Sequence, residues 1–442
     1  DNDFSLIIAL DCGIKAIDKV AYASEKGIDF IICDHHRPGP EIPKAVAVLD
    51  PKRSDCEYPF KELCGCGVGF KLIQALSHHR RQGSDENIRE GIPEELILYL
   101  DLVATAIGAD IVPITGENRI LAYYGLKVIN SNPRNGFKAI LKQVKKEVLT
   151  ITDVVFIIAP RINAAGRMKH GNYAVTLLTE TDITLAVKYA SEIEEFNVSR
   201  KDADKRITKE ALQQIEEKGE QKRLTTVVYD ENWHKGVIGI VASRLTETYY
   251  RPTLVFTKSG EKLAASARSV KGFDVYNALE ACSEYIEQFG GHMYAAGLTL
   301  LEKDYEKFKA KFEEVVSETI ERKLLVPEIK INAELNLNDI TPKFYRILKQ
   351  FAPFGPGNMT PVFMTQHLKD TGWGKCVGDD KTHLRLTVKQ QNSLQFIAIG
   401  FGMGEKKNLA CEGELFKAAY VIDENQWQGN VSLQLRLKDI TP

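Results

Sequence analysis

The sequence predicts a mixed α/β protein with four successive parts: a parallel-sheet domain, a long connecting helix, a second α/β domain and a small terminal β-barrel. Three observations indicate this fold class. Two apolar runs flank a helical pattern in the first forty or so residues, a long charged stretch near the middle has apolar residues at helical spacing, and short alternating runs fill roughly the last eighty residues. A strand, helix, strand succession is typical of parallel sheets, whereas closely spaced short strands are typical of β-barrels.

The first expected domain, residues 1–183, opens on a βαβ unit. Residues 5–10 and 30–33 are apolar runs, and residues 14–26 between them have a helical pattern that Gly27 ends. Continuous apolar strands of this kind belong to parallel sheets that are covered on both faces. Further helices are expected at residues 67–81, 94–107 and 119–131.

The middle of the chain is expected to contain a connecting helix over residues 184–222 and a second α/β domain over residues 223–326. The connecting stretch has apolar residues at helical spacing and then becomes strongly polar. The second domain is expected to hold strands near residues 226–229 and 253–256 and helices at residues 237–248 and 305–323.

The last part, residues 327–442, has a different pattern. A helix is expected at residues 342–350, and a Pro/Gly-rich hinge follows at residues 353–358. Five short runs of alternating polar and apolar residues follow within about eighty residues. They predict five strands that form a small β-barrel of the oligonucleotide-binding (OB) kind. The five runs lie at residues 361–367, 383–389, 395–401, 414–421 and 432–437.

Composition excludes several classes of protein. Hydrophobic residues make up 44% and charged residues 27% of the chain, which rules out disordered, collagen-like and disulfide-scaffold proteins. Lys plus Arg (58) nearly balance Asp plus Glu (60), so any nucleic acid must be held by a local groove rather than by overall charge. Eight cysteines without a Cys-x-x-Cys pair favour a reducing, cytoplasmic location. No apolar run approaches the roughly 18 residues of a membrane span, so no membrane association is expected.

The sharpest chemical signal lies where the first two expected strands end. Asp11 follows the first strand, and Asp34, His35 and His36 follow the second. Because the carboxyl ends of neighbouring parallel strands meet at one crevice, these side chains are expected close together. Carboxylate and imidazole groups suit Mn²⁺ or Mg²⁺ bound for phosphoryl chemistry. An aspartate at a strand end is also a common helix cap or turn residue, so both interpretations stay open at this point.

Two further aspartates, Asp101 and Asp110, lie nine residues apart in a helical pattern. On one helix they face different directions, so they cannot both enter one site. We expect Asp101 at the crevice, and Asp110, which follows Gly108, in a helix-end or turn role.

Other polar motifs indicate anion binding. Residues 159–167 (APRINAAGR) place Arg161 and Arg167 around small residues, residues 266–269 (SARS) combine hydroxyls with a guanidinium, and residues 290–292 are Gly-Gly-His. Backbone amides, hydroxyls and guanidinium groups are the donors that surround phosphate oxygens. Residues 234–236 (HKG), before a helix start, are similar. Each motif alone is typical of a turn or cap, but three in one domain favour phosphate binding.

Taken in order, these motifs resemble those of the RecJ family of single-strand-specific 5′ to 3′ DNA exonucleases, within the DHH phosphoesterase superfamily. The resemblance implies a DHH-type parallel-sheet domain, a DHH-associated substrate-binding domain and an OB-like nucleic-acid-binding domain. The matching segments span essentially the whole chain: residues 9–13 (ALDCG), 34–36 (DHH), 101–104 (DLVA), 159–167 (APRINAAGR), 233–244 (WHKGVIGIVASR), 266–269 (SARS), 290–297 (GGHMYAAG) and 353–358 (PFGPGN).

The resemblance implies an enzyme that degrades single-stranded DNA to mononucleotides from the 5′ end in DNA repair and recombination, through two-metal hydrolysis with Mn²⁺ or Mg²⁺. It implies Asp11, His35 and Asp101 as metal ligands, with His36 close by and Asp34 as a further candidate ligand. Expected partners are single-stranded DNA, a single-strand-binding protein and a helicase, and the chain is expected to be a monomer. The residues implied to hold the 5′-terminal phosphate and the DNA backbone are Arg161, Arg167, Ser266, Arg268, Gly291 and His292.

One departure from the family pattern stands out. The family has an Asp-x-Asp motif at the end of a strand upstream of this chain's first residue, and that motif supplies metal ligands. Asp1 and Asp3 lack the glycine and the apolar strand that surround it. We therefore expect an amino-terminally truncated member whose two-metal site is incomplete and whose activity as it stands is an open question.

Two alternatives remain. A DHH phosphodiesterase acting on oligoribonucleotides or cyclic dinucleotides shares the first two domains, but it does not explain the barrel, whose aromatic residues could stack on bases. The other alternative is a catalytically inert DHH-fold scaffold that binds single-stranded DNA. Such scaffolds lose their metal ligands, whereas this chain keeps them. The barrel aromatics are Trp373, Phe396, Phe401, Tyr420 and Trp427. At least half of these five are expected in the core of the barrel.

Overall fold

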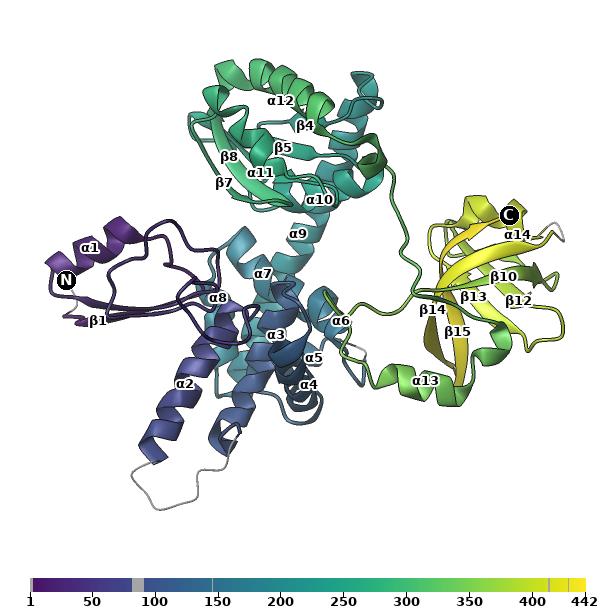
Figure 1. Cartoon of the computed structure of the whole chain (residues 1–442), viewed down its shortest axis with the longest axis horizontal. Coiled ribbons are helices and arrows are strands. Elements are labelled where there is room, and N and C mark those ends of the chain that lie inside the picture. Colours follow the sequence, from purple (N-terminus) through teal and green to yellow (C-terminus); the bar gives the residue numbers. More distant parts are fainter. Residues whose placement is uncertain (1–2, 82–90, 145, 412–413, 428) are drawn as a thin grey trace. The chain divides into compact units, whose positions relative to one another are not determined.

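The computed structural model (Figure 1) describes residues 3–81, 91–144, 146–411, 414–427 and 429–442. The chain divides into two compact units. The first unit comprises residues 1–134, 145–159 and 329–442, and the second comprises residues 135–144 and 160–328. Each unit is described by itself below.

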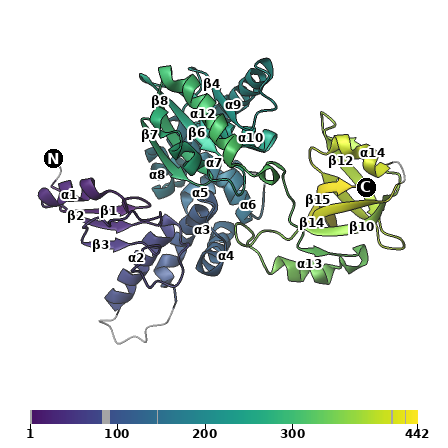
Figure 2. The same ribbon diagram turned by 45° about the horizontal axis from the view of Figure 1, so that its top comes forward.

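The first unit begins with the expected parallel sheet. Strands β1 (Leu6–Leu10), β2 (Asp29–Cys33) and β3 (Ala47–Leu49) pair in that order and all run parallel (Figure 2). Helix α1 (Ile17–Glu25) connects the first two strands. It starts three residues later than expected, after a turn in which the amide of Ala16 donates to the carbonyl oxygen of Gly13 and the amide of Ile14 donates to the carboxylate of Asp34.

The helices that follow in the first unit pack on one another around α3. The helix expected at residues 94–107 is divided at Leu100, with a 3₁₀ turn before it and an α-helix after it. A Cβ on Gly125 would lie 2.2 Å from the carbonyl oxygen of Leu100, so α3 and α4 approach one another too closely for any other residue. The elements are α2 (Gly65–Arg81), η1 (Glu94–Tyr99), α3 (Leu100–Ala109), α4 (Gly116–Ser131), α6 (Ile151–Asp153) and the π-helical η2 (Val154–Ile158).

The second unit contains the long helix α9 (Ile183–Glu217), whose 35 residues span about 50 Å. Asp182 caps it by accepting hydrogen bonds from the amides of Thr184 and Leu185 at 2.7 and 3.0 Å. Three shorter helices accompany it in this unit: α5 (Asn135–Leu141), α7 (Ala159–Met168) and α8 (Asn172–Thr179).

A five-stranded sheet completes the second unit, with helices on both of its faces. Its strand order is β4-β5-β6-β8-β7, with β4 and β5 parallel and the other neighbours antiparallel. Phe256 and Leu263 pack on the α12 side, whereas Val228 and Val255 pack with α10 and α9 on the other. The elements are β4 (Thr226–Tyr229), α10 (Ile238–Tyr249), β5 (Thr253–Ser259), β6 (Lys262–Arg268), α11 (Val275–Glu280), β7 (Gln288–His292), β8 (Ala295–Leu301) and α12 (Tyr305–Thr319).

The carboxyl-terminal part of the first unit is a closed β-barrel. Five strands follow one another as β12-β13-β15-β14-β10, and pairing of β10 with β12 closes the ring, as in an OB-fold. The two last strands are longer than expected because they form one extended hairpin. The elements are β9 (Ala333–Glu334), α13 (Pro342–Lys349), β10 (Phe363–Asp370), β11 (Lys375–Val377), β12 (His383–Lys389), β13 (Phe396–Gly400), α14 (Lys407–Cys411), β14 (Phe416–Trp427) and β15 (Asn430–Thr441).

The fold class expected from the sequence is confirmed: a parallel-sheet domain, a long helix, a second α/β sheet and an OB-like barrel are all present. Among the described residues, no helix combines the length and the apolar character needed to cross a bilayer.

Candidate functional site

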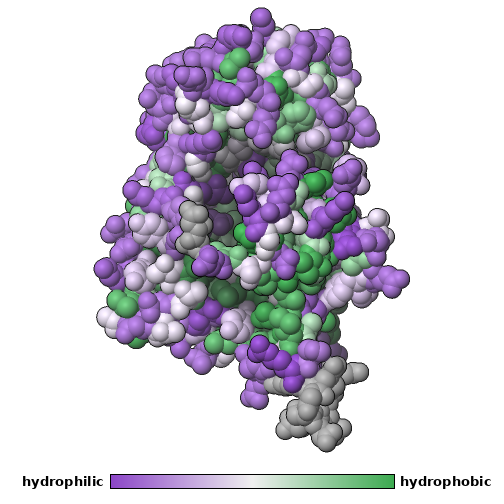
Figure 3. Space-filling view, turned by 90° about the vertical axis from the view of Figure 1, so that its left-hand side faces the viewer, coloured by the Kyte–Doolittle hydropathy of each residue, from purple (hydrophilic) through white to green (hydrophobic). Residues whose placement is uncertain are grey.

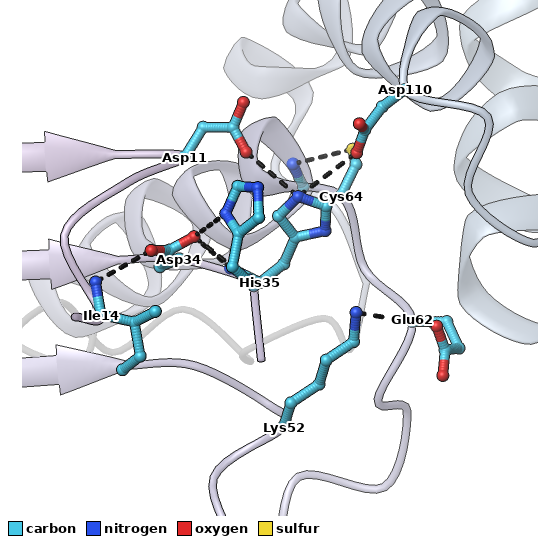
Figure 4. A network of polar contacts seen from close by, with 10 residues as sticks. Asp11, Ile14, Asp34, His35, Lys52, Glu62, Cys64 and Asp110 are labelled. Atoms are coloured by element: carbon cyan, nitrogen blue, oxygen red, sulfur yellow. Dashed lines mark hydrogen bonds and ion pairs between the residues drawn. The ribbon is translucent and has the colours of Figure 1, made fainter. Parts of the chain in front are cut away.

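The ends of strands β1 and β2 bring Asp11 and His35 together, as the strand pattern predicts. Leu10 pairs with Cys33, so the residues that follow them lie side by side. The Nε2 atom of His35 lies 3.2 Å from Oδ1 of Asp11 (Figure 4). Asp11 has a left-handed backbone with φ of 63°, which is uncommon outside glycine and turns its exposed carboxylate toward the imidazole.

Asp34 lies directly beneath this pair and holds the turn that carries the histidines. Its Oδ2 accepts the amide of Ile14 at 2.9 Å, and its Oδ1 accepts the amides of His35 and His36 and lies 2.7 Å from Nδ1 of His36. Burial by itself would raise the pKa of this carboxyl, but these hydrogen bonds lower it below its ordinary value. Because both oxygens are engaged inside the protein, Asp34 is a positioning carboxylate, and the structure does not support the expectation that it is a ligand.

Asp110 is the carboxylate that joins the cluster, which corrects the sequence-based expectation. It lies at the carboxyl end of α3, and its Oδ2 is 3.3 Å from Nε2 of His35. Burial raises the pKa of Asp110, His35 opposes the rise, and the negative charge of Asp11 adds to it. The sequence signal that could have identified Asp110 is its position at the end of an apolar helix, where we expected only a helix-end or turn role.

Asp101, the expected ligand, is occupied elsewhere. Its side chain is fully buried, and its carboxylate forms an ion pair of 2.8 Å with Arg134 and accepts the Arg134 amide at 3.1 Å. Asp101 and Asp110 lie near opposite ends of α3, about 13 Å apart along the axis at 1.5 Å per residue. The packing of α3 therefore places Asp110, and not Asp101, at the strand ends.

The donor set of the cluster fits a divalent cation. Asp11, His35 and His36 offer ligand atoms within 4.8 Å of one another, and Asp110 adds a second carboxylate beside His35. Asp11 and Asp110 place two negative charges beside one imidazole. These charges repel each other, and a cation bound between them would offset the repulsion. Carboxylate and imidazole ligands suit Mn²⁺, and carboxylates suit Mg²⁺.

Helix α2 begins against the same cluster. A Cβ on Gly65, its first residue, would lie 2.1 Å from Oδ1 of Asp11, so only glycine fits there. Burial raises the pKa of the neighbouring Cys64 and Cys66 thiols to about 12 and about 11, so both thiols stay protonated near neutral pH.

An apolar cavity of about 330 Å³ lies beside Asp11 and Asp110. Figure 3, which looks onto the amino-terminal side of the molecule, shows hydrophobic residues gathered at the surface. Both carboxylates thus have a largely apolar wall on one side. The apolar lining includes Leu10, Phe70, Ile73, Tyr99, Leu102, Val103 and Ala106.

In the second unit, Ser266, Arg268 and His292 project from one face of the five-stranded sheet. Arg268 pairs across the sheet with Ala295, which in turn pairs with His292, so the two polar side chains flank a small residue. Ser266 lies two positions earlier on β6 and accepts a hydrogen bond from Nη1 of Arg268 at 3.0 Å. A Cβ on Gly291 would lie 2.4 Å from the carbonyl oxygen of Ala295, so this close approach of β7 to β8 requires glycine.

Arg167 reaches the same face through the loop before α10. Its Nη1 donates to the carbonyl oxygen of Gly236 at 3.1 Å. Three residues further on, Gly239 leaves room for the Arg268 guanidinium, because a Cβ there would be 3.1 Å from Nη2. Burial lowers the pKa of Arg268, and the charge of Arg167 lowers it further. Two guanidinium groups, a hydroxyl and a helix amino terminus thus form an anion-binding arrangement.

Arg161, expected in this group, forms an ion pair of 2.6 Å with Glu194 on α9. Arg200, one or two turns further along α9, was not identified from the sequence. Its Nη2 donates to Oδ1 of Asn197 at 3.0 Å, and its buried Nε has no hydrogen-bond partner among the described residues. Burial lowers its pKa, Asp204 opposes this effect, and the charge of Arg167 adds to it. Arg200 is therefore a further guanidinium near the anion-binding face.

The barrel aromatics divide between core and surface. Phe396 and Tyr420 are buried in the barrel core, whereas Trp373 is 73% and Phe401 64% exposed. The side chain of Trp427 lies outside the described residues. Lys375, Arg385 and Arg436 lie in one cross-strand row on the outer surface, linked in register through Ile399 of β13.

Family models match three segments of the chain. The DHH family N-terminal domain matches residues 2–107, the DHHA1 domain matches residues 221–318 and the RecJ OB domain matches residues 331–439.

Curated proteins and solved structures agree with these matches. The single-stranded-DNA-specific exonuclease RecJ of Bacillus subtilis is 35% identical over 99% of this chain, which spans 54% of that relative's length. The protein of the same name from Salmonella typhimurium is 34% identical over 99% of this chain and 77% of its own length. The crystal structure of RecJ in complex with Mn²⁺ from Thermus thermophilus superposes with a TM-score of 0.84 at 27% identity, over 99% of this chain and 62% of that one. The crystal structure of exonuclease RecJ bound to manganese gives a TM-score of 0.59 at 30% identity, over 72% of this chain and 76% of that one. The chain belongs to the RecJ family of single-stranded-DNA-specific exonucleases.

Proposed function

We propose that this chain carries the core of a divalent-cation-dependent exonuclease that degrades single-stranded DNA from its 5′ end to mononucleotides in DNA repair and recombination. The proposal rests on one observation at the ends of β1, β2 and α3. Nε2 of His35 lies 3.2 Å from the carboxylate of Asp11 and 3.3 Å from the carboxylate of Asp110. Catalytic clusters at the carboxyl ends of parallel strands are the usual arrangement in open α/β sheets.

Asp11, His35 and Asp110 are the residues we propose to hold Mn²⁺ or Mg²⁺, with His36 beside them. A bound cation of this kind supplies Lewis acidity to a phosphate oxygen and lowers the pKa of a bound water. A site with two cations, and its incompleteness in this chain, remain predictions. The protein's own contribution is to fix the ligands: Asp34 holds the histidine turn, and α3 carries Asp110.

We propose that the second unit binds the phosphates of the DNA strand. Ser266, Arg268 and Arg167 provide a hydroxyl and two guanidinium groups, and His292 and the backbone of Gly291 lie on the neighbouring strand. Such contacts orient the backbone without reading base sequence. The structure gives Arg161 a different partner, Glu194, so we assign it a supporting role.

We further propose that the barrel contacts single-stranded DNA. The cations Lys375, Arg385 and Arg436 share one row, and Trp373 and Phe401 offer exposed aromatic rings on which bases can stack. A single-strand-binding protein and a helicase as partners, and a monomeric, cytoplasmic protein, stay predictions.

The test is digestion of a 5′-phosphorylated single strand labelled at its 3′ end, with and without Mn²⁺. Duplex DNA, a 5′-hydroxyl strand and a cyclic dinucleotide serve as comparison substrates. We expect Mn²⁺-dependent shortening of the single strand from its 5′ end, abolished by His35→Ala. The matched control is His79→Ala, because His79 is an exposed histidine on α2.

The outcomes separate the alternatives. Faster cleavage of the cyclic dinucleotide would favour a small-molecule phosphodiesterase, and DNA binding without cleavage would favour an inert scaffold. A version of the chain extended by the family's upstream Asp-x-Asp strand tests the prediction that the two-metal site of this chain is incomplete. If only the extended version cleaves, the set of ligands in this chain is insufficient.

A further inference from the structure

The Pro/Gly-rich segment that the sequence predicts to be a hinge is a closed turn. We refer to residues 353–358 as the PFGPGN turn. The amide of Gly355 donates to the carbonyl oxygen of Asn358 at 3.0 Å, and the Asn358 amide donates back to Gly355 at 2.8 Å. The Asn358 side chain donates to the carbonyl oxygens of Phe351 and Pro353 at 2.8 and 3.0 Å. These bonds give the turn a defined shape of its own.

The PFGPGN turn packs against the loop that follows Asp110. The amide of Ile114 donates to the carbonyl oxygen of Pro356 at 2.7 Å. A Cβ on Gly355 would lie 2.4 Å from Cδ1 of Ile114, and one on Gly357 would lie 2.9 Å from Cγ2 of Thr115. Gly357 also has a φ of 74°, which favours glycine. Both glycines of the turn are therefore explained by close contact with this loop.

A second contact fixes the approach to the turn. Arg119, in the first part of α4, donates to the carbonyl oxygens of Gln350, Phe351 and Ala352 at 2.9 to 3.2 Å. These carbonyls lie directly after the end of α13, in the segment that leads into the turn. A guanidinium at this position satisfies them and ties α4 to the segment that enters the turn.

The loop held in this way begins at Asp110 and has little freedom. Ile111 has a left-handed backbone with φ of 58°, Pro113 has a fixed φ, and Ile114 is 2% exposed. The buried Asn118 side chain donates to the carbonyl oxygen of Pro113 at 3.0 Å. Only three residues separate Asp110 from Ile114, so a shift at Ile114 is transmitted to Asp110 over a short, stiff connection.

We propose that the PFGPGN turn and Arg119 are positioning elements that hold Asp110 beside His35 and thereby set the affinity of the cluster for a divalent cation. Helix α3 anchors Asp110 on one side and the turn anchors the following loop on the other. A ligand held at both ends is ordered before the cation arrives, so less conformational entropy is lost on binding. Substitutions in outer-shell partners of metal ligands typically cost 10–100-fold in affinity. This inference rests on the proposed metal-binding role of Asp110.

The test measures Mn²⁺ affinity of the whole chain by calorimetry, with the metal alone as the probe. Gly355→Ala should weaken Mn²⁺ binding about tenfold, at the lower limit of that range. Gly171→Ala is the matched control, because a Cβ on Gly171 would meet no atom within 4 Å and its φ is −57°. Adding Ile114→Ala to Gly355→Ala removes both overlapping atoms, Cδ1 at 2.4 Å and Cγ1 at 2.9 Å, and should recover part of the lost affinity.

Arg119→Ala tests the same idea without steric overlap, in case the glycine variant does not fold. It should also weaken Mn²⁺ binding and speed hydrogen exchange at the Ile114 amide. Unchanged Mn²⁺ affinity in folded Gly355→Ala and Arg119→Ala, with normal binding by the unsubstituted chain, would overturn the inference. Failure of the unsubstituted chain to bind Mn²⁺ would instead overturn the proposed function, so the two failures are distinguishable.

Discussion

The Nε2 atom of His35 lies 3.3 Å from Oδ2 of Asp110, although one residue follows a strand and the other ends a helix. The same nitrogen lies 3.2 Å from Oδ1 of Asp11. His35 thus links the parallel sheet to helix α3. Its side chain is nearly buried, so the link lies at the base of the cluster rather than at its rim.

The first prediction compares the two aspartates of α3. Asp110→Asn should weaken Mn²⁺ binding at least tenfold, because it removes a negatively charged donor beside His35. Asp101→Asn should leave the cluster's donors unchanged, since Asp101 contacts Arg134. Calorimetric titration of both folded variants with Mn²⁺ checks this. Equal losses in the two would contradict the assignment of Asp110.

The second prediction concerns the stability of the Asp101–Arg134 pair. Asp101→Ala should lower the free energy of unfolding by about 3–5 kcal/mol, because it removes the buried carboxylate that pairs with Arg134. The double variant Asp101→Ala with Arg134→Met should lose less than the single one, since the guanidinium that paired with Asp101 is removed as well. Urea denaturation followed by circular dichroism measures both values; an equal or larger loss in the double variant would count against this explanation.

The third prediction tests the anion-binding face. Arg268→Ala should weaken binding to single-stranded DNA and reduce the slope of log affinity against log salt by about 0.7, the value for one lost phosphate contact. Arg206→Ala is the control, because Arg206 is exposed on α9 and pairs with Glu210. Fluorescence anisotropy at several salt concentrations gives the slopes. A slope that Arg268→Ala leaves unchanged would exclude a phosphate contact.

The fourth prediction separates Arg200 from Arg161. Arg200→Gln should also reduce the salt slope by about 0.7, because its guanidinium lies near Arg167 and its Nε has no partner among the described residues. Arg161→Gln should leave the slope unchanged and instead lower thermal stability, as should Glu194→Gln, because the two form one ion pair. The reverse pattern, with Arg161 alone changing the slope, would restore the sequence-based assignment.

The fifth prediction concerns the Gly-Gly-His strand. Gly291→Ala should destabilise the second unit by about 1–3 kcal/mol, because the new Cβ would overlap the carbonyl oxygen of Ala295 and the backbone φ is 151°. Gly290→Ala, which has open space at the same strand, should have little effect. Thermal unfolding of the two variants checks the difference, and similar melting temperatures would show that β7 can shift without cost.

Local patterns in the sequence were sufficient for the order of the elements and for part of the cluster. Apolar runs of strand length predicted β1 and β2. Because the ends of neighbouring parallel strands lie together, the sequence also predicted that Asp11 and His35 are close to one another. The family and the fold class are confirmed as well. The assignments of the remaining site residues stay predictions until the variants above are measured.

The sequence by itself determined the succession of strands and helices. Hydrophobic periodicity and the residues that end helices and strands are local properties of the sequence. Only the tertiary structure decided between Asp101 and Asp110, since the choice depends on how α3 packs against its neighbours. The ion pair between Arg161 and Glu194 and the contact of the PFGPGN turn with Ile114 also depend on the tertiary structure. Each of these contacts joins residues far apart in the chain, and their partners are selected by shape and charge complementarity that no local pattern encodes.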